Sequence, residues 1–176
     1  NNLLLLILAW ITTSLFLHQL LLFYPGRAGA RRAAHKKFLF ARLGDVALIG
    51  GSTCLFIATG TTDITDINLA ARTGEGGAWF TAAAILLAVA AMLKSAQFPF
   101  HGWLVEVMEA PTPVSALLHA GVINAGGFLL IRFSDVIITA PGVLAVLVLT
   151  GGFTALFASM VMLTQPAVKT SLAWST

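Results

Sequence analysis

The sequence predicts an all-α fold, a polytopic transmembrane helix bundle with about five or six spans. Of the 176 residues, 58% are hydrophobic and only 10% are charged, whereas soluble domains carry roughly a quarter charged residues. Apolar runs of about 20 residues, the length that crosses the hydrocarbon core as a helix, recur along the chain. We therefore expect a single membrane domain over residues 1–176, surrounded by membrane lipid.

The first predicted helix covers residues 3–24 and stops at Pro25 and Gly26, two residue types that end helices. The chain starts without an initiator Met and without the basic start and small-residue cleavage site of a signal peptide. Its last residues, "KTSLAWST", open a sixth helix near Lys169 but do not complete a span. We interpret the chain as part of a longer subunit, truncated at both ends.

A basic segment follows the first helix, with five Lys and Arg and no acid between residues 27 and 37. The positive-inside rule places this segment in the cytoplasm, where we expect a loop, and it orients the other spans in the cell (inner) membrane. The net charge of +3 is then a membrane-anchoring feature, and no nucleic-acid partner is expected. Cys54 lies alone in an apolar run, so neither an intrachain disulfide framework nor a cysteine metal cluster is predicted.

The remaining apolar runs predict helices over residues 38–60, 78–94, 114–133 and 142–164. The acidic stretch 61–77 is expected as a loop on the outer side. A break is predicted near residues 94–100, because Pro99 cannot donate a backbone hydrogen bond within a helix. Two further prolines, at positions 111 and 113, precede the next span.

Lys94 is the strongest candidate for a proton-translocation site. An ionisable group at bilayer depth costs at least ~2.5 kcal/mol and normally serves a purpose. Lys94 lies deep in its helix just before the break, which frees backbone carbonyls and opens a hydrated gap. Movement of a carboxylate partner would make the buried amine load and release a proton. The alternative, a lysine that snorkels to the inner interface, leaves the neighbouring break unexplained.

Other polar groups in the apolar runs are weaker candidates. His119 titrates near neutral pH and suits a proton relay, although lone histidines are more often structural. His18 lies in mid-helix, where an interhelical hydrogen bond is the alternative, and Lys169 is either an anchor for the sixth helix or a second proton-translocation site. Arg42 and Asp45 are three residues apart on one helical face and are expected to form a structural ion pair.

No phosphate-binding glycine loop, metal-ligand cluster or nucleophile–base pair is evident in the sequence. We therefore expect neither a catalytic residue nor a cofactor or metal in this chain, and not an enzyme that acts alone. The buried charges favour translocation of protons or other cations.

The run "KSAQFPFHGWLVEVMEAPTPVSALLHAGVINAGGFLLIR", with "ARLGDV" before it and "QPAVKTSLAWST" after it, resembles the antiporter-like proton-translocating subunits of complex I and of Mrp cation antiporters. The resemblance implies inverted repeats of five helices, of which this chain would cover most of the first. It also implies that Lys94 is the lysine of the broken helix, His119 the relay histidine and Lys169 the lysine of the following cytoplasmic turn. Arg42 and Asp45 match the family's "R-x-G-D" segment.

The first helix departs from the family pattern. Complex I members place a glutamate directly after a tryptophan, and that glutamate pairs with the lysine of the broken helix. Here Ile11 follows Trp10, so the usual carboxylate partner of Lys94 is absent. His18, seven residues further on the same helical face, is expected to take over part of this role.

The patterns "W-x-x-x-S-L-x-L-H", "RRAAHKK" and "SLAWST" are most similar to the membrane subunits of Dab-type two-component inorganic-carbon pumps. That resemblance implies an energy-coupled pump for carbon dioxide or bicarbonate, with a separate soluble zinc subunit of the carbonic-anhydrase-like DabA type as partner. One alternative is a proton-pumping subunit of an NADH-quinone oxidoreductase or a Mrp-type antiporter, with other membrane subunits of those complexes as partners. A third is a non-conducting scaffold that keeps the fold for assembly.

Overall fold

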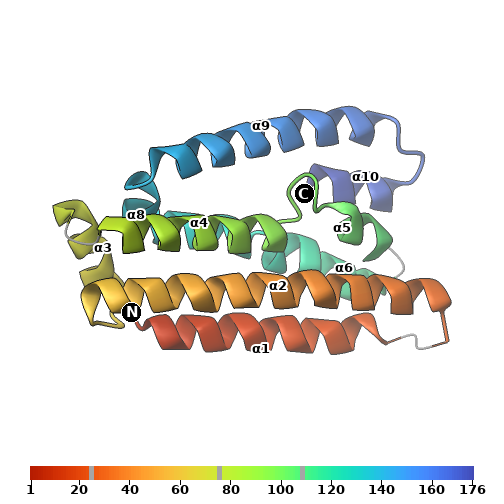
Figure 1. Cartoon of the computed structure of the whole chain (residues 1–176). Coiled ribbons are helices and arrows are strands. Elements are labelled where there is room, and N and C mark those ends of the chain that lie inside the picture. Colours follow the sequence, from red (N-terminus) through yellow and green to blue (C-terminus); the bar gives the residue numbers. More distant parts are fainter. Residues whose placement is uncertain (24–25, 75–76, 108–109) are drawn as a thin grey trace.

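The computed structural model describes residues 1–23, 26–74, 77–107 and 110–176. These residues form helices joined by short turns (Figure 1), which confirms the all-α prediction. The long helices are α1 (Leu3–Leu21), α2 (Ala28–Thr59), α4 (Gly77–Lys94) and α9 (Pro141–Leu163). The shorter ones are α3 (Ile64–Thr73), α5 (Gly102–Glu106), α6 (Thr112–Leu117), the π-helical turn η2 (Leu118–Val122), α7 (Ala125–Arg132), α8 (Ser134–Ile138) and α10 (Val168–Ser175).

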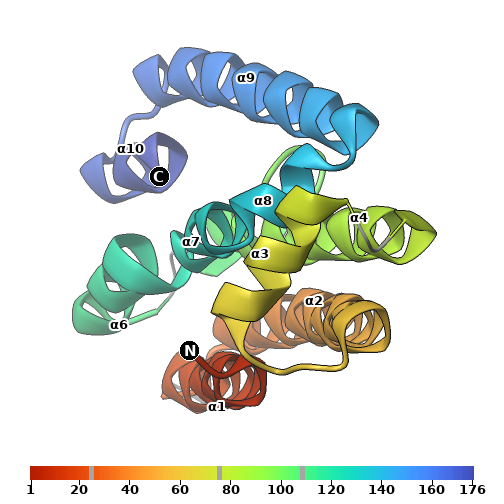
Figure 2. The ribbon, with the colours of Figure 1, turned by 90° about the vertical axis from the view of Figure 1, so that its left-hand side faces the viewer.

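Five spans among the described residues are long and apolar enough to cross a membrane. Four are α1, α2, α4 and α9, and the fifth is the composite span Thr112–Arg132, built from α6, η2 and α7. The spans lie side by side in Figure 1, and the end-on view in Figure 2 places α1 and α2 at one edge of the bundle and α9 at the other. No residue of α9 is fully buried, and Val143 and Leu147 are the α9 side chains that lie partly buried against the main hydrophobic core.

Local sequence determines several helix ends. The Asn2 side chain accepts hydrogen bonds from two backbone N–H groups in the first turn of α1, and Asp63 accepts one from the Thr65 N–H at the start of α3, at 2.8 Å. Both are residue types that cap helices well. The Thr65 bond also lowers the pKa of the Asp63 carboxyl below its usual value. Gly60 ends α2 with a φ of 67°, a backbone conformation that glycine adopts without strain.

Small residues allow α2 and α4 to pack closely along much of their length. At Gly51 of α2, an added Cβ would lie 3.3 Å from side-chain atoms of Leu86 and Leu87 and 3.4 Å from the carbonyl oxygen of Ala83. Fully buried leucines and alanines surround this contact and belong to the main hydrophobic core. The α2–α4 pair therefore positions the Lys94 end of α4 relative to α2.

Two segments predicted as loops contain helices, so these expectations were wrong. The basic segment, residues 27–37, is largely the first three turns of α2, because the alanines between its cations are strong helix formers. The acidic stretch, residues 61–77, contains α3, in which Ile64, Ile67 and Ala71 form one buried stripe at helical spacing. Charge pattern indicates the side of the membrane but does not distinguish a loop from a polar helix.

The predicted break near residues 94–100 is confirmed. α4 ends at Lys94, Ala96 has a φ of 50°, and the Phe98–Pro99 peptide is cis. The chain becomes helical again at Gly102. The break therefore begins directly after the candidate lysine.

The other predicted helices agree with the structure to within a few residues. The helix expected over 3–24 is α1, which ends at Leu21, while its predicted stop at Pro25 lies outside the described residues. The helix expected over 114–133 is the composite span, interrupted by η2, and the helix expected over 142–164 is α9.

Candidate functional site

Lys94 is held inside the bundle, with only 8% of its surface exposed. Its Nζ lies 4.4 Å from the centroid of the Trp10 ring on α1, a cation–π contact. Both residues line a largely apolar cavity of about 370 Å³ between α1 and the composite span, together with Leu117 and Gly121. The side chain is therefore directed toward α1 and the cavity.

The backbone at the break is bound by the neighbouring helices. The Ser95 hydroxyl donates to the carbonyl oxygen of Ile123 at 3.0 Å, and the backbone N–H of Phe98 donates to the Thr154 hydroxyl of α9 at 3.1 Å. Gly126 of α7 packs so tightly on α4 that an added Cβ would overlap the Ser95 hydroxyl. These contacts fix the position of the break, and hence of Lys94, relative to α7 and α9.

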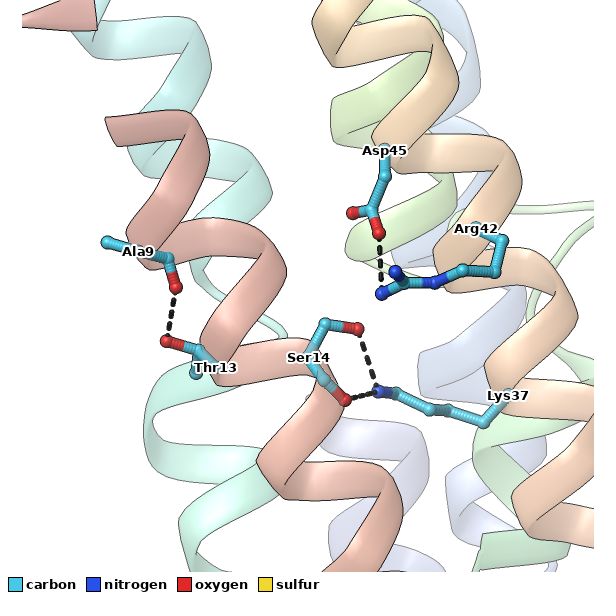
Figure 3. Close-up of polar contacts among 6 residues, drawn as sticks. All are labelled: Ala9, Thr13, Ser14, Lys37, Arg42 and Asp45. Atoms are coloured by element: carbon cyan, nitrogen blue, oxygen red, sulfur yellow. Dashed lines mark hydrogen bonds and ion pairs between the residues drawn. The ribbon is translucent and has the colours of Figure 1, made fainter. Parts of the chain in front are cut away.

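Asp45 of α2 is the carboxylate that interacts electrostatically with Lys94. It is 4% exposed, and its Oδ2 lies 2.5 Å from Nη2 of Arg42 in an ion pair (Figure 3). Ile11, the position at which the family resemblance led us to look for a glutamate, is apolar and half-buried. The lysine thus has a carboxylate within electrostatic range even though α1 supplies none at position 11.

Lys37 is a second buried lysine, although its place in the basic segment predicted only a role in membrane anchoring. It is 3% exposed, and its Nζ donates to the carbonyl oxygen and the hydroxyl of Ser14 on α1, at 3.0 and 3.1 Å (Figure 3). It interacts electrostatically with Lys94, Arg42 and Asp45. Lys37 and Asp45 are eight residues apart, a little over two turns, so a helix extended to residue 28 would have revealed their common side.

His119 and Lys169 are brought together at another place in the bundle. His119 lies in η2, and single π-helical turns are frequent at functional sites. Its Nδ1 lies 3.0 Å from the Thr176 hydroxyl, and its Nε2 is buried without a hydrogen-bond partner among the described residues. Lys169 of α10 interacts electrostatically with His119 and donates to the Ala110 carbonyl oxygen at 2.7 Å.

The described contacts of His18 are made with α2. Its ring centroid lies 4.7 Å from that of Phe38 and 6.1 Å from that of His35, and it interacts electrostatically with Lys37. A role as partner of Lys94 stays a prediction. The structure places His18 beside the other buried lysine.

Comparison with known proteins points to one family. Residues 1–176 match the family described as NADH:quinone oxidoreductase/Mrp antiporter, transmembrane. Over its whole length the chain is 49% identical to the "Probable inorganic carbon transporter subunit DabB" of Hydrogenovibrio crunogenus and 36% identical to NADH-quinone oxidoreductase subunit L of Pseudomonas aeruginosa. It covers 34% and 29% of these proteins, so the chain spans about a third of the length of the curated relatives it matches.

A solved structure shares the same helix arrangement. The Mrp complex from Dietzia sp. DQ12-45-1b superposes with a TM-score of 0.91 and 31% sequence identity, over 99% of this chain and 19% of the matched chain. The family match and the structural match thus each cover nearly the whole chain. On this evidence, the chain belongs to the NADH:quinone oxidoreductase/Mrp antiporter family of multi-pass membrane proteins.

Proposed function

We propose that this chain forms part of the ion path of a proton- or cation-translocating membrane subunit. The supporting observation is the environment of Lys94, a buried ammonium at a helix break, on the Trp10 ring and beside a cavity. Keeping a cation there is costly in a membrane protein, which favours a functional reason for it. The irregular backbone after Lys94 is of the kind that membrane proteins tolerate where it is buried in protein or lines a water-filled cavity.

The Arg42–Asp45 ion pair of α2 would control whether Lys94 carries a proton. Asp45 is in electrostatic range of Lys94 and is held 2.5 Å from Arg42. Movement of the pair toward Lys94 or away from it would change the affinity of the amine for a proton, because a nearby carboxylate favours the charged form. We assign proton loading to Lys94 and its control to the Arg42–Asp45 pair.

His119 and Lys169 are assigned to a later step of the same path. The imidazole has one ring nitrogen beside the Thr176 hydroxyl and one buried without a described hydrogen-bond partner. A neutral imidazole accepts a proton at one nitrogen and releases one from the other, which suits a relay near neutral pH. The positive charge of Lys169 would oppose long residence of a second charge on His119.

We further propose that the subunit belongs to an energy-coupled pump for inorganic carbon, taken up as carbon dioxide or bicarbonate. Support comes from the 49% identity to a probable inorganic carbon transporter subunit, compared with 36% to the quinone oxidoreductase subunit. The replacement of the complex I glutamate by Ile11 also favours this assignment. The partner would be a separate soluble subunit with a zinc site of the carbonic-anhydrase type.

A second candidate is a subunit of an NADH-quinone oxidoreductase or of a Mrp-type cation/proton antiporter. The observation that favours it is the TM-score of 0.91 to a Mrp complex. In such an assembly the same Lys94 path would be driven by electron transfer or by a sodium gradient. The partners would then be other membrane subunits.

Growth of a carbonic-anhydrase-deficient bacterium in ambient air separates the two candidates. The full-length protein and its neighbouring soluble subunit should together restore growth, and Lys94→Met should abolish the rescue. Lys36→Met is the matched control, because this lysine is 43% exposed and pairs with Glu106 at the surface. Absence of rescue by the assembled wild-type complex would favour the antiporter or oxidoreductase assignment.

A further inference from the structure

A buried ammonium lies outside the path just described, in the seam between α1 and α2. Lys37 is 3% exposed, whereas the side chain of its neighbour Lys36 is 43% exposed and forms an ion pair with Glu106. Both residues occupy the same turn of α2 near its basic end. Burial of Lys37 is therefore a property of this position and not of the whole basic segment.

The partners of Lys37 are neutral. Its Nζ donates to the carbonyl oxygen and the hydroxyl of Ser14, and no described carboxylate forms an ion pair with it. An ammonium has three N–H donors, and the contacts with Ser14 on α1 occupy two of them. A methionine or leucine would fill the same seam without the cost of burying a charge. Helix packing alone therefore does not account for a lysine here.

Titratable and charged groups surround Lys37 on each helix that packs near it. His18 faces it from α1, Arg42 and Asp45 lie further along α2, and Lys94 comes from α4. On α5, Glu106 is engaged by Lys36 instead. Figure 3 shows the Lys37 side chain directed from α2 to Ser14, with the Arg42–Asp45 pair next along the helix.

These groups form a series from the exposed end of the bundle to Lys94. His35 is exposed on α2, and its ring centroid lies 6.1 Å from that of the half-buried His18. His18 interacts electrostatically with Lys37, and Lys37 with Asp45 and Lys94. Because like charges repel, a proton on Lys37 disfavours a proton on Lys94. Occupation of one lysine is then coupled to occupation of the other.

We propose that Lys37 is a proton-carrying residue that takes protons from the basic end of the bundle, by way of His35 and His18, and passes them toward Asp45 and Lys94. This inference rests on the proposed proton translocation and adds an entry branch to it. In each transfer one proton moves: the Lys37 amine accepts it from the His18 imidazolium or from water, and the resulting ammonium releases it toward Asp45 or Lys94. No electrons are exchanged.

The test measures proton flux in proteoliposomes that contain the full-length protein with its partner, using a pH-sensitive dye. Lys37→Met replaces the buried amine with an apolar side chain of similar size and leaves no unpaired charge behind, so the variant should assemble. Lys37→Arg keeps the charge but cannot release a proton. We expect both to reduce flux at least tenfold, and Lys36→Met, the matched control, to change it by less than twofold.

Lys37→His tests whether the residue must titrate, because a purely structural role would not change how proton flux depends on pH. A histidine restores a titratable group with a different pKa, so flux should partly return with a shifted dependence on pH. Wild-type flux in Lys37→Met and Lys37→Arg, with flux lost in Lys94→Met, would overturn the entry branch and leave the proposed function intact. Wild-type flux in Lys94→Met as well would overturn the proposed function itself.

Discussion

The contact between α4 and α7 at Gly126 gives a stability prediction that can be worked from the structure. In Gly126→Ala, the new Cβ would lie 2.5 Å from the carbonyl oxygen of Ala91 and would overlap the Ser95 hydroxyl. Backbone atoms cannot rotate away, so the helices must separate locally. Overpacking of this kind costs about 1–3 kcal/mol, and loss of the Ser95–Ile123 hydrogen bond adds about 1 kcal/mol. We expect a total destabilisation of about 2–4 kcal/mol.

Gly127→Ala is the matched control on the same helix. An added Cβ at Gly127 has no atom within 4 Å, and alanine is favoured over glycine in a helix by roughly 0.5–1 kcal/mol. Thermal unfolding of the purified full-length protein in detergent should therefore show a lower Tm for Gly126→Ala and an unchanged or higher Tm for Gly127→Ala. Equal Tm values for the two variants would refute the close packing of α7 on the break.

Three further predictions concern the charged site and one helix cap. Trp10→Leu removes the ring beneath Lys94, a contact worth about 0.5–2 kcal/mol, and should lower both the Tm and proton flux. Asp45→Asn leaves Arg42 beside a neutral partner and should lower the free energy of unfolding by about 3 kcal/mol. The double variant Arg42→Met/Asp45→Leu removes both groups and should recover part of the lost Tm. The lowered pKa of Asp63 means that its cap stabilises α3 at neutral pH and is lost as the pH falls through that lowered value. Amide hydrogen exchange in α3, compared with Asp63→Ala at each pH, should show the difference disappear in acid.

Each of these predictions has an outcome that would contradict it. Trp79→Leu is the control for Trp10→Leu, because Trp79 is 48% exposed, and equal effects of the two changes would argue against the cation–π contact. A double Arg42/Asp45 variant no more stable than Asp45→Asn would show that the unpaired arginine is not the source of the loss. Protection of α3 that stays the same in wild type and Asp63→Ala at neutral pH would exclude a capping role.

The architecture was largely predictable because it follows from apolar run length. Each predicted span is a run of about 20 apolar residues. The predicted helix ends agree with the structure because prolines and glycines stop helices by their own backbone geometry. The break after Lys94 was predictable for the same reason. Helix formation in the polar segments was not foreseen, because hydropathy records the membrane-embedded length and ignores polar helices such as α3 and the first turns of α2.

The candidate site was predictable only where a charge interrupts an apolar run. Lys94 and His119 stand alone among apolar residues, so the cost of burying them is visible in the sequence. Lys37 lies among other cations, and its common side with Asp45 can be seen in the sequence only if the helix is extended to residue 28. The family resemblance predicted no carboxylate for Lys94 on α1 and His18 as its substitute, whereas Asp45 of α2 lies within electrostatic range of Lys94. Such pairings depend on how helices are rotated against one another, which a single sequence does not specify.

The central claim, that Lys94 carries protons through this bundle, is tested most directly by proton flux through the full-length protein with its partner in proteoliposomes. Lys94→Met and Lys36→Met should be compared after both are shown to assemble equally well. We predict that flux falls at least tenfold in Lys94→Met and stays within twofold of wild type in Lys36→Met. Equal flux in Lys94→Met and wild type would contradict the account and favour a structural role for this buried lysine.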